Sequence, residues 1–188
     1  MTLLTDDQFN AELDKAVQIV KRFLADVPAT SLPPGLSVIA WDATASAKQT
    51  LPIFLADFAD EKKYTILEAV GQKLGKDRVD VLAVFLVTEV WLRRPQETPS
   101  GPVYGAITGE AVSVAGAAHD GRKNLCLLPI QRGRDRRILL EPAKAIVMEY
   151  QAGGASQVHS DLLDALWNGY RNGRARGRPG IGTPPSDN

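Results

Sequence analysis

The sequence has few residues that bind metals or form disulfides: one cysteine, Cys126, and two histidines among 188 residues. A single cysteine excludes an intramolecular disulfide, which is typical of a reducing compartment, so we expect a cytoplasmic protein. A zinc site would need carboxylates as additional ligands, and neither His119 nor His159 has a partner at ligand spacing. We therefore predict no metal or other cofactor, and we expect Cys126 to be a small buried apolar residue.

Long apolar segments are also missing. The longest uninterrupted apolar run, Val81–Val87, has seven residues, whereas a membrane-spanning helix needs roughly 20. The N-terminus carries neither a basic segment nor an apolar one, so no signal peptide is expected. These absences predict a soluble protein without a membrane partner.

Motifs of catalysis and nucleotide binding are absent or incomplete. The chain has no Gly-x-Ser-x-Gly, and no Gly-x-Gly-x-x-Gly follows a predicted strand. The segment 71–77 resembles a phosphate-binding loop only in part, because it is one residue short, lacks the Ser or Thr that would meet magnesium, and follows a helix. We interpret Gly75 instead as the glycine that ends this helix. An enzyme is therefore less expected than a non-catalytic protein.

The charge is balanced overall but uneven along the chain. The 22 basic and 22 acidic side chains cancel, yet residues 1–92 hold 9 basic and 13 acidic ones and residues 93–188 hold 13 and 9. This asymmetry either makes a dipolar surface that aids solubility or directs the second half toward an anionic partner. We favour the first interpretation, because the excess in the second half is far below that of a basic domain.

Apolar periodicity predicts both helices and strands. A composition with 44% hydrophobic residues is sufficient for a core. Thr5–Gln8 forms a capping box before a run with helical spacing, and the segment from Val79 to Leu92 is apolar on both faces, as in a central strand covered on both sides. The expected elements are a helix over 6–26, a hairpin over 36–58, a helix capped by Asp60 and ended by Gly75, a strand over 79–92, a loop over 93–109, strands over 110–118, 122–132 and 138–140, and a final helix after Ser160.

This order predicts an α+β fold with a mostly antiparallel sheet, packed by N-terminal, middle and C-terminal helices. Residues 1–170 are expected to form one globular domain, with a helix over 1–27 and a proline-rich linker over 28–35. Residues 171–188, rich in Arg, Gly and Pro, are expected to be a disordered tail. Residues 142–151 fit either a strand or a helix.

One charged residue is out of place in this pattern. Glu89 lies on the same face of the predicted central strand as Phe85, Val87 and Trp91. A buried carboxylate is costly unless it is paired or protonated, so Glu89 is either a functional acid beside Trp91 or a structural group that pairs with Arg93, Arg94 or a backbone amide. We favour the structural role, because a second carboxylate is missing.

The strand that ends in Glu89-Val90-Trp91, after a helix and before a hairpin, resembles an uncharacterised group of small prokaryotic and phage α+β proteins. The similarity covers residues 36–140. It implies a fold and no particular activity.

Two arginine clusters are candidates for binding nucleic acid. The first lies in a predicted turn and the second in the predicted tail. No aromatic residue alternates with either, so base stacking is not expected, and a solvated tail and a charged turn that protects a sheet edge are the favoured interpretations. The clusters are Arg132, Arg134, Arg136 and Arg137, and Arg171, Arg174, Arg176 and Arg178.

The sequence thus predicts a non-catalytic interaction or accessory protein whose partner is a protein, acting through its sheet surface or the 93–109 segment. One alternative is weak, sequence-nonspecific binding of nucleic acid through the two arginine clusters. The other is a small enzyme that uses Glu89.

Overall fold

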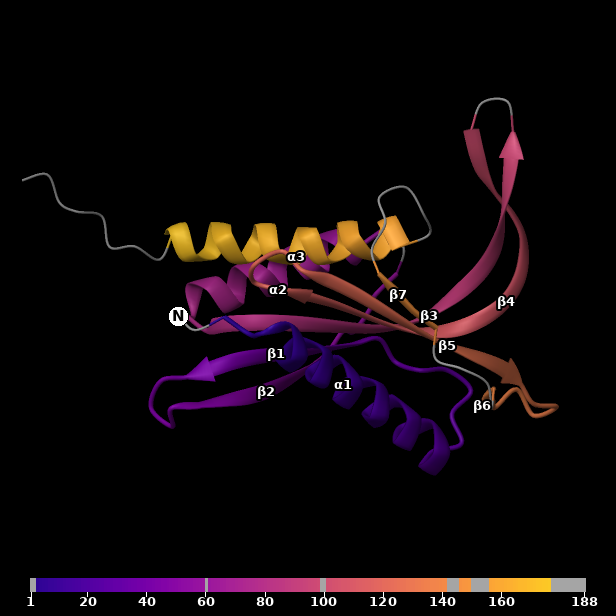
Figure 1. Ribbon diagram of the computed structural model, residues 1–188, viewed down its shortest axis with the longest axis horizontal. Helices are drawn as coiled ribbons and strands as arrows, with labels where there is room; N and C mark the ends of the chain where they lie inside the picture. The colour runs from indigo at the N-terminus through magenta and orange to yellow at the C-terminus, as the bar shows by residue number, and fades with distance from the viewer. Residues whose placement is uncertain (1–2, 60, 99–100, 142–145, 150–155, 177–188) are drawn as a thin grey trace, which may run out of the picture.

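The computed structural model describes residues 3–59, 61–98, 101–141, 146–149 and 156–176, and in these residues helices cover both faces of one antiparallel sheet (Figure 1). The helices are α1 (Asp6–Asp26), α2 (Lys63–Lys76) and α3 (Ser156–Arg176). The strands are β1 (Gly35–Asp42), β2 (Ala47–Phe54), β3 (Asp80–Thr98), β4 (Gly101–Ala118), β5 (Lys123–Arg132), β6 (Ile138–Leu140) and β7 (Ile146–Glu149). The predicted α+β class is confirmed.

The sheet has the strand order β2-β1-β3-β4-β5-β6, and β7 pairs with β5 beside β6. All these pairs are antiparallel. The described part of the ambiguous segment 142–151 is therefore a strand, and the rest of that segment lies outside the described residues. None of the described helices is long and apolar enough to cross a membrane.

Two separate cores lie on the two sides of the sheet. On one side, here called the α1 face, Phe85 of β3 packs with Phe9 of α1, and their ring centroids are 5.5 Å apart. On the other, the α2–α3 face, Val84 and Leu86 pack with Leu166 of α3. Because successive strand residues point to opposite faces, the all-apolar run in β3 supplies both cores, as its pattern predicted.

The predicted capping box begins α1. The Gln8 N–H donates to Thr5 Oγ1 (3.2 Å), and the Thr5 N–H donates to Gln8 Oε1 (3.0 Å). The buried stripe of this helix then covers the α1 face. By contrast, α2 begins after Lys62 without a side-chain cap, and Asp60, the predicted cap, lies outside the described residues.

Four glycines set the contact between α2 and α3. An ideal Cβ on Gly71 would lie 2.0 Å from the Leu166 carbonyl oxygen, and one on Gly75 would lie 2.3 Å from that of Tyr170. From the other helix, Gly169 and Gly173 approach the backbone of α2 equally closely. The prediction that Gly75 ends its helix was therefore wrong: it lies inside α2, where only hydrogen fits between two parallel helices, and Arg78 (φ 57°) takes the left-handed conformation after the helix.

The predicted loop over 93–109 was also wrong. β3 and β4 stay paired beyond the predicted strand ends. Leu92 of β3 pairs with Gly109 of β4, and after register shifts around Arg93 the pairing continues until Thr98 pairs with Gly101. In Figure 1 this ribbon extends past the other strands and curls toward the side of α3. The prolines and glycines that indicated a loop are accommodated because a two-stranded ribbon has open edges and tolerates bulges.

The C-terminal helix is longer than predicted. α3 continues to Arg176, so Arg171, Arg174 and Arg176 are helical residues and the boundary at 171 was wrong. The reason is tertiary, because Gly173 packs against Gln72 and Lys76 of α2 and extends the helix contact. Residues 177–188, including Arg178, lie outside the described residues.

A candidate interaction groove beside α1

The α1 face is only partly covered by its helix. α1 packs chiefly against β3, β4 and β6. Strands β1 and β2, at the other edge of the sheet, have little contact with this helix. Alternate residues of β2 point toward the α1 face, and two of them, Pro52 and Phe54, lie opposite Ser37 and Gly35 of β1. The open strip between α1 and β2 is therefore lined by apolar side chains from both elements.

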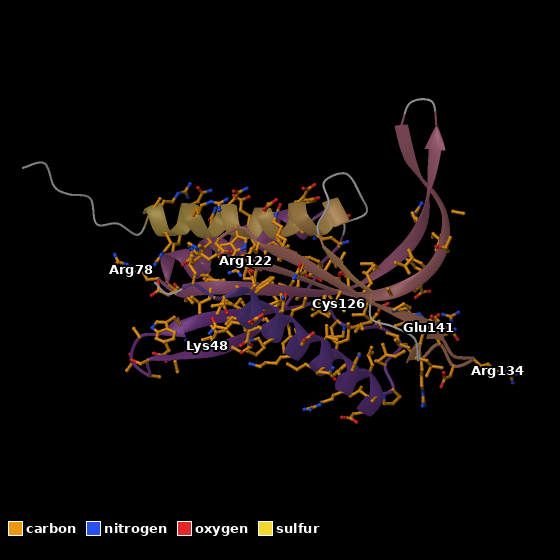
Figure 2. All side chains as sticks on the ribbon, viewed as in Figure 1. Lys48, Arg78, Arg122, Cys126, Arg134 and Glu141 are labelled. Atoms are coloured by element: carbon orange, nitrogen blue, oxygen red, sulfur yellow. The ribbon has the colours of Figure 1, made fainter. Side chains whose placement is uncertain are left out.

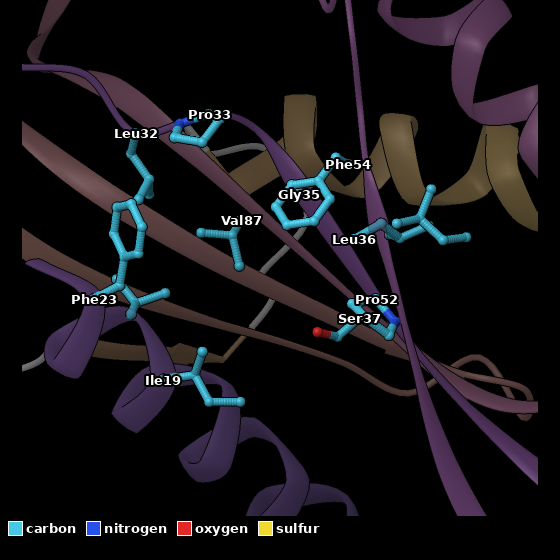
Figure 3. Close-up of a pocket in the computed structure, with 12 residues that line it drawn as sticks. Ile19, Phe23, Leu32, Pro33, Gly35, Leu36, Ser37, Pro52, Phe54 and Val87 are labelled. Carbon is cyan, nitrogen blue, oxygen red and sulfur yellow. The ribbon is translucent and has the colours of Figure 1, made fainter. Parts of the chain in front are cut away.

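An apolar groove of about 240 Å³ occupies this strip (Figure 3). Ile19 and Phe23 of α1 form one wall, Pro52 and Phe54 of β2 form the other, and Val87 of β3 lies between them. Leu32 and Pro33 of the linker between α1 and β1 close one end (Figure 3). Among the described lining side chains only that of Ser37 is polar, so the groove is suited to an apolar partner.

Two wall residues are unusually exposed for their type. Phe54 is 80% exposed and Ile19 is 60% exposed. The groove is open beside Phe54 because Gly35, its cross-strand neighbour, has no side chain. A Cβ on Gly35 would meet only the Ile53 carbonyl oxygen, at 3.9 Å, so the space above this glycine is open. A contiguous apolar surface of this kind marks a binding site more often than a single exposed leucine does.

An ion-pair cluster anchors the linker that closes the groove. The Arg132 guanidinium donates to Glu89 (Nη2 to Oε2, 2.5 Å), to Glu110 (Nε to Oε2, 2.9 Å) and to the Thr30 carbonyl. The Leu32 N–H donates to Glu89 Oε1. The Arg132 cluster, as we call these groups, therefore holds the linker against the sheet and keeps Leu32 at the end of the groove.

Glu89 thus has partners on both carboxylate oxygens, a backbone amide and an arginine. A backbone amide was among the expected partners, whereas Arg132 from β5 was not; the Arg94 side chain lies outside the described residues. The pKa of Arg132 is raised: partial burial opposes its charge, but hydrogen bonds to Glu110 and Glu89 outweigh that effect. Trp91 lies two residues beyond Glu89 on β3, opposite Glu110, and is 62% exposed.

The two predicted arginine clusters are not brought together. Arg134 lies near one end of the molecule, whereas the C-terminal end of α3 lies at the other (Figures 1 and 2). In the first cluster Arg132 is held by two carboxylates, and Arg137 pairs with Asp135 at 2.7 Å. In the second, Arg174 pairs with Asp80 at 2.6 Å. The described arginines therefore form no continuous basic stripe.

Comparison with protein-family models, curated proteins and solved structures finds no match for the chain. The resemblance to the prokaryotic and phage group stays a prediction.

Cys126 and His119 lie on opposite sides of the sheet. Cys126 is buried in the core of the α1 face, as predicted, and burial raises the pKa of its thiol. His119 packs edge-on against Trp167 of α3, with ring centroids 5.4 Å apart. Burial lowers the pKa of His119; Asp120 opposes this effect, the nearby Arg171 and Arg174 add to it, and the net direction is down. No group of three potential metal ligands gathers among the described residues.

The groove residues were not recognised in the sequence, although a signal existed. Ile19 is apolar yet lies outside the buried stripe of α1. Pro52 and Phe54 share one face of β2, and Leu51 and Ile53 share the other. Phe54 could therefore have been assigned to a second apolar surface. What the sequence lacks is any sign that these two residues lie across one groove.

Proposed function

We propose that this protein is a non-catalytic interaction protein that binds an apolar segment of a partner protein in the groove between α1 and β2. The observation that carries the proposal is the exposure of Phe54 and Ile19 across an almost wholly apolar groove. A cytoplasmic location, expected from the single cysteine, is part of the same proposal.

The groove offers enough apolar surface for specific binding. Full burial of one Phe or Ile side chain contributes about 1.5–3 kcal/mol, and interfaces concentrate their binding energy in a few such central residues. The Arg132 cluster supports this role, because an end wall held at Leu32 lowers the entropy lost when a partner binds.

The two alternatives have less support. Nucleic-acid binding through both arginine clusters requires them to act together, whereas Arg134 and the C-terminal end of α3 lie at opposite ends of the molecule (Figures 1 and 2). Acid–base chemistry by Glu89 has less support because both carboxylate oxygens already accept hydrogen bonds, one from a backbone amide and one from the Arg132 guanidinium.

Position-specific photocrosslinking tests the proposal. A photoreactive phenylalanine analogue replaces Phe54 in the cells that produce the protein, and a matched protein carries it at Tyr64, an exposed aromatic residue of α2. We expect a discrete crosslinked partner from position 54 that is absent from position 64 and is lost when Ile19→Asp is added. Identical products from both positions, or none from position 54, would contradict the proposal.

A further inference from the structure

The two faces of the sheet carry different numbers of described helices. The path from β2 to β6 contains six strands, and the five spacings between them, about 4.8 Å each, span roughly 24 Å. A helix covers about 10 Å. The α2–α3 face has two helices, whereas the α1 face has one, packed mainly on β3, β4 and β6. The strip over β1 and β2 is about as wide as one further helix.

The open edge of β2 is poorly suited to a strand as the occupant. The Leu55 N–H donates to the Pro34 carbonyl (3.1 Å), so the odd-numbered residues of β2 direct their backbone groups toward β1. Pro52 therefore faces the open edge, where it has no N–H to donate. An added strand would meet a missing donor in the middle of β2, whereas a helix lying over the strip satisfies its own backbone groups.

A second copy of this chain has no described helix to offer. The outward surface of α1 is mostly polar: a hollow on it is lined by Asp14, Lys15, Gln18 and Arg22, with Ala11 and Ile19 as its apolar members. The apolar stripes of α2 and α3 are already buried against the sheet and each other. Since none of the described helices of a second copy is suited to the groove, the charge beside the groove and the width of the strip favour a helix from a different protein.

Two lysines lie beyond the groove lining, Lys15 one turn before Ile19 on α1 and Lys48 four residues before Pro52 on β2. Glu12 of α1 accepts hydrogen bonds from both Lys15 (2.9 Å) and Lys48 (3.0 Å), so one carboxylate faces two ammonium groups. The Lys15 side chain remains 66% exposed. The exposed ammonium group of Lys15 lies one helical turn before Ile19, where an acidic residue of a partner would pair with it.

We propose that the groove binds an amphipathic helix of another protein, lying beside α1 over β1 and β2, with its apolar stripe toward Val87 and acidic residues toward Lys15 and Lys48. This inference rests on the proposed function and names the class of partner.

Peptide display tests this directly. A random library of peptides of about 16 residues, roughly four helical turns, is selected on the full chain and counter-selected on Ile19→Asp. The affinities of the surviving peptides are then measured for three proteins: the parent, the Gly35→Val variant, which fills the open space beside Phe54, and the control variant Tyr64→Asp. Thermal unfolding of each variant verifies that it is folded.

We expect the selected peptides to carry apolar residues at helical spacing with Asp or Glu beside them. Their affinity should fall about tenfold or more in Gly35→Val, as for loss of one central contact, and stay unchanged in Tyr64→Asp. Lys15→Glu should weaken the binding of these peptides without altering the fold of the protein.

Other results would overturn the inference in different ways. Groove-dependent peptides with alternating apolar residues would show that an extended segment binds, which refutes the helix and leaves the proposed function standing. An absence of groove-dependent binders would refute both. A dimer that Phe54→Asp dissociates would show that a second copy fills the groove, which also refutes the helix from another protein.

Discussion

The close contact between α2 and α3 makes Gly71 the residue whose substitution has the most distinctive expected outcome. In Gly71→Ala the added methyl group would lie 2.0 Å from the Leu166 carbonyl oxygen and 2.8 Å from the Tyr170 backbone nitrogen. These atoms belong to helix backbone and cannot rotate away, so α2 and α3 must separate by more than about 1 Å to reach an ordinary contact.

The sign of the change in stability decides the argument. In a helix without such a contact, Gly→Ala raises stability by about 1 kcal/mol, because alanine has the higher helix propensity. Overpacking of a well-packed contact costs about 1–3 kcal/mol and sometimes more. Because the overlap is with backbone along a whole helix contact, we expect the cost to dominate and the net loss to be about 2 kcal/mol, or roughly 4–8 °C in Tm.

Thermal and urea unfolding of the wild type, Gly71→Ala and Asn172→Ala measure this effect. Asn172 is exposed on α3, next to Gly173, so its replacement tests helix propensity without a clash. Asn172→Ala should leave the free energy of unfolding unchanged or slightly raised. A Gly71→Ala variant as stable as the wild type, or more so, would refute the close packing of these helices.

Three further predictions concern the groove, the Arg132 cluster and His119. Ile19→Asp and Phe54→Ser should change the free energy of unfolding by no more than about 0.5 kcal/mol, because both side chains are largely exposed; a loss of several kcal/mol in chemical unfolding would show that they belong to the core. Glu89→Leu should cost about 1–3 kcal/mol by leaving Arg132 and the Leu32 N–H short of an acceptor, whereas Glu89→Gln should cost less; a Leu variant that melts above the wild type would point to a functional acid instead. Because the pKa of His119 is lowered in the folded protein, the unfolded chain binds its proton more tightly, and Tm should fall as the pH drops below about 6.5. His119→Gln should reduce that fall between about pH 7.5 and 5.5, and an identical pH profile for both proteins would contradict the shift.

The sequence by itself determined the elements whose periodicity is strong and local. The stripe on α1, its capping box and the two apolar faces of β3 were all read correctly, because they depend on which way neighbouring side chains point. The gap left between the predicted strands over 110–118 and 122–132 is the turn that joins β4 and β5, with Gly121 at a φ of 93°. These patterns specify the direction each residue faces and leave its partner undefined.

Tertiary structure decided the features in which distant segments meet. The glycines at 71, 75, 169 and 173 resemble helix ends or breakers in sequence, yet they let α2 and α3 approach closely. Glu89 pairs with Arg132, an arginine 43 residues away on β5 that the sequence pattern did not indicate. The groove requires Ile19 of α1 and Phe54 of β2 to lie on either side of Val87, which follows from strand order and from where α1 settles on the sheet. Local preferences are too weak to specify such pairings, because the free energy that selects them comes from burial shared by elements far apart in the chain.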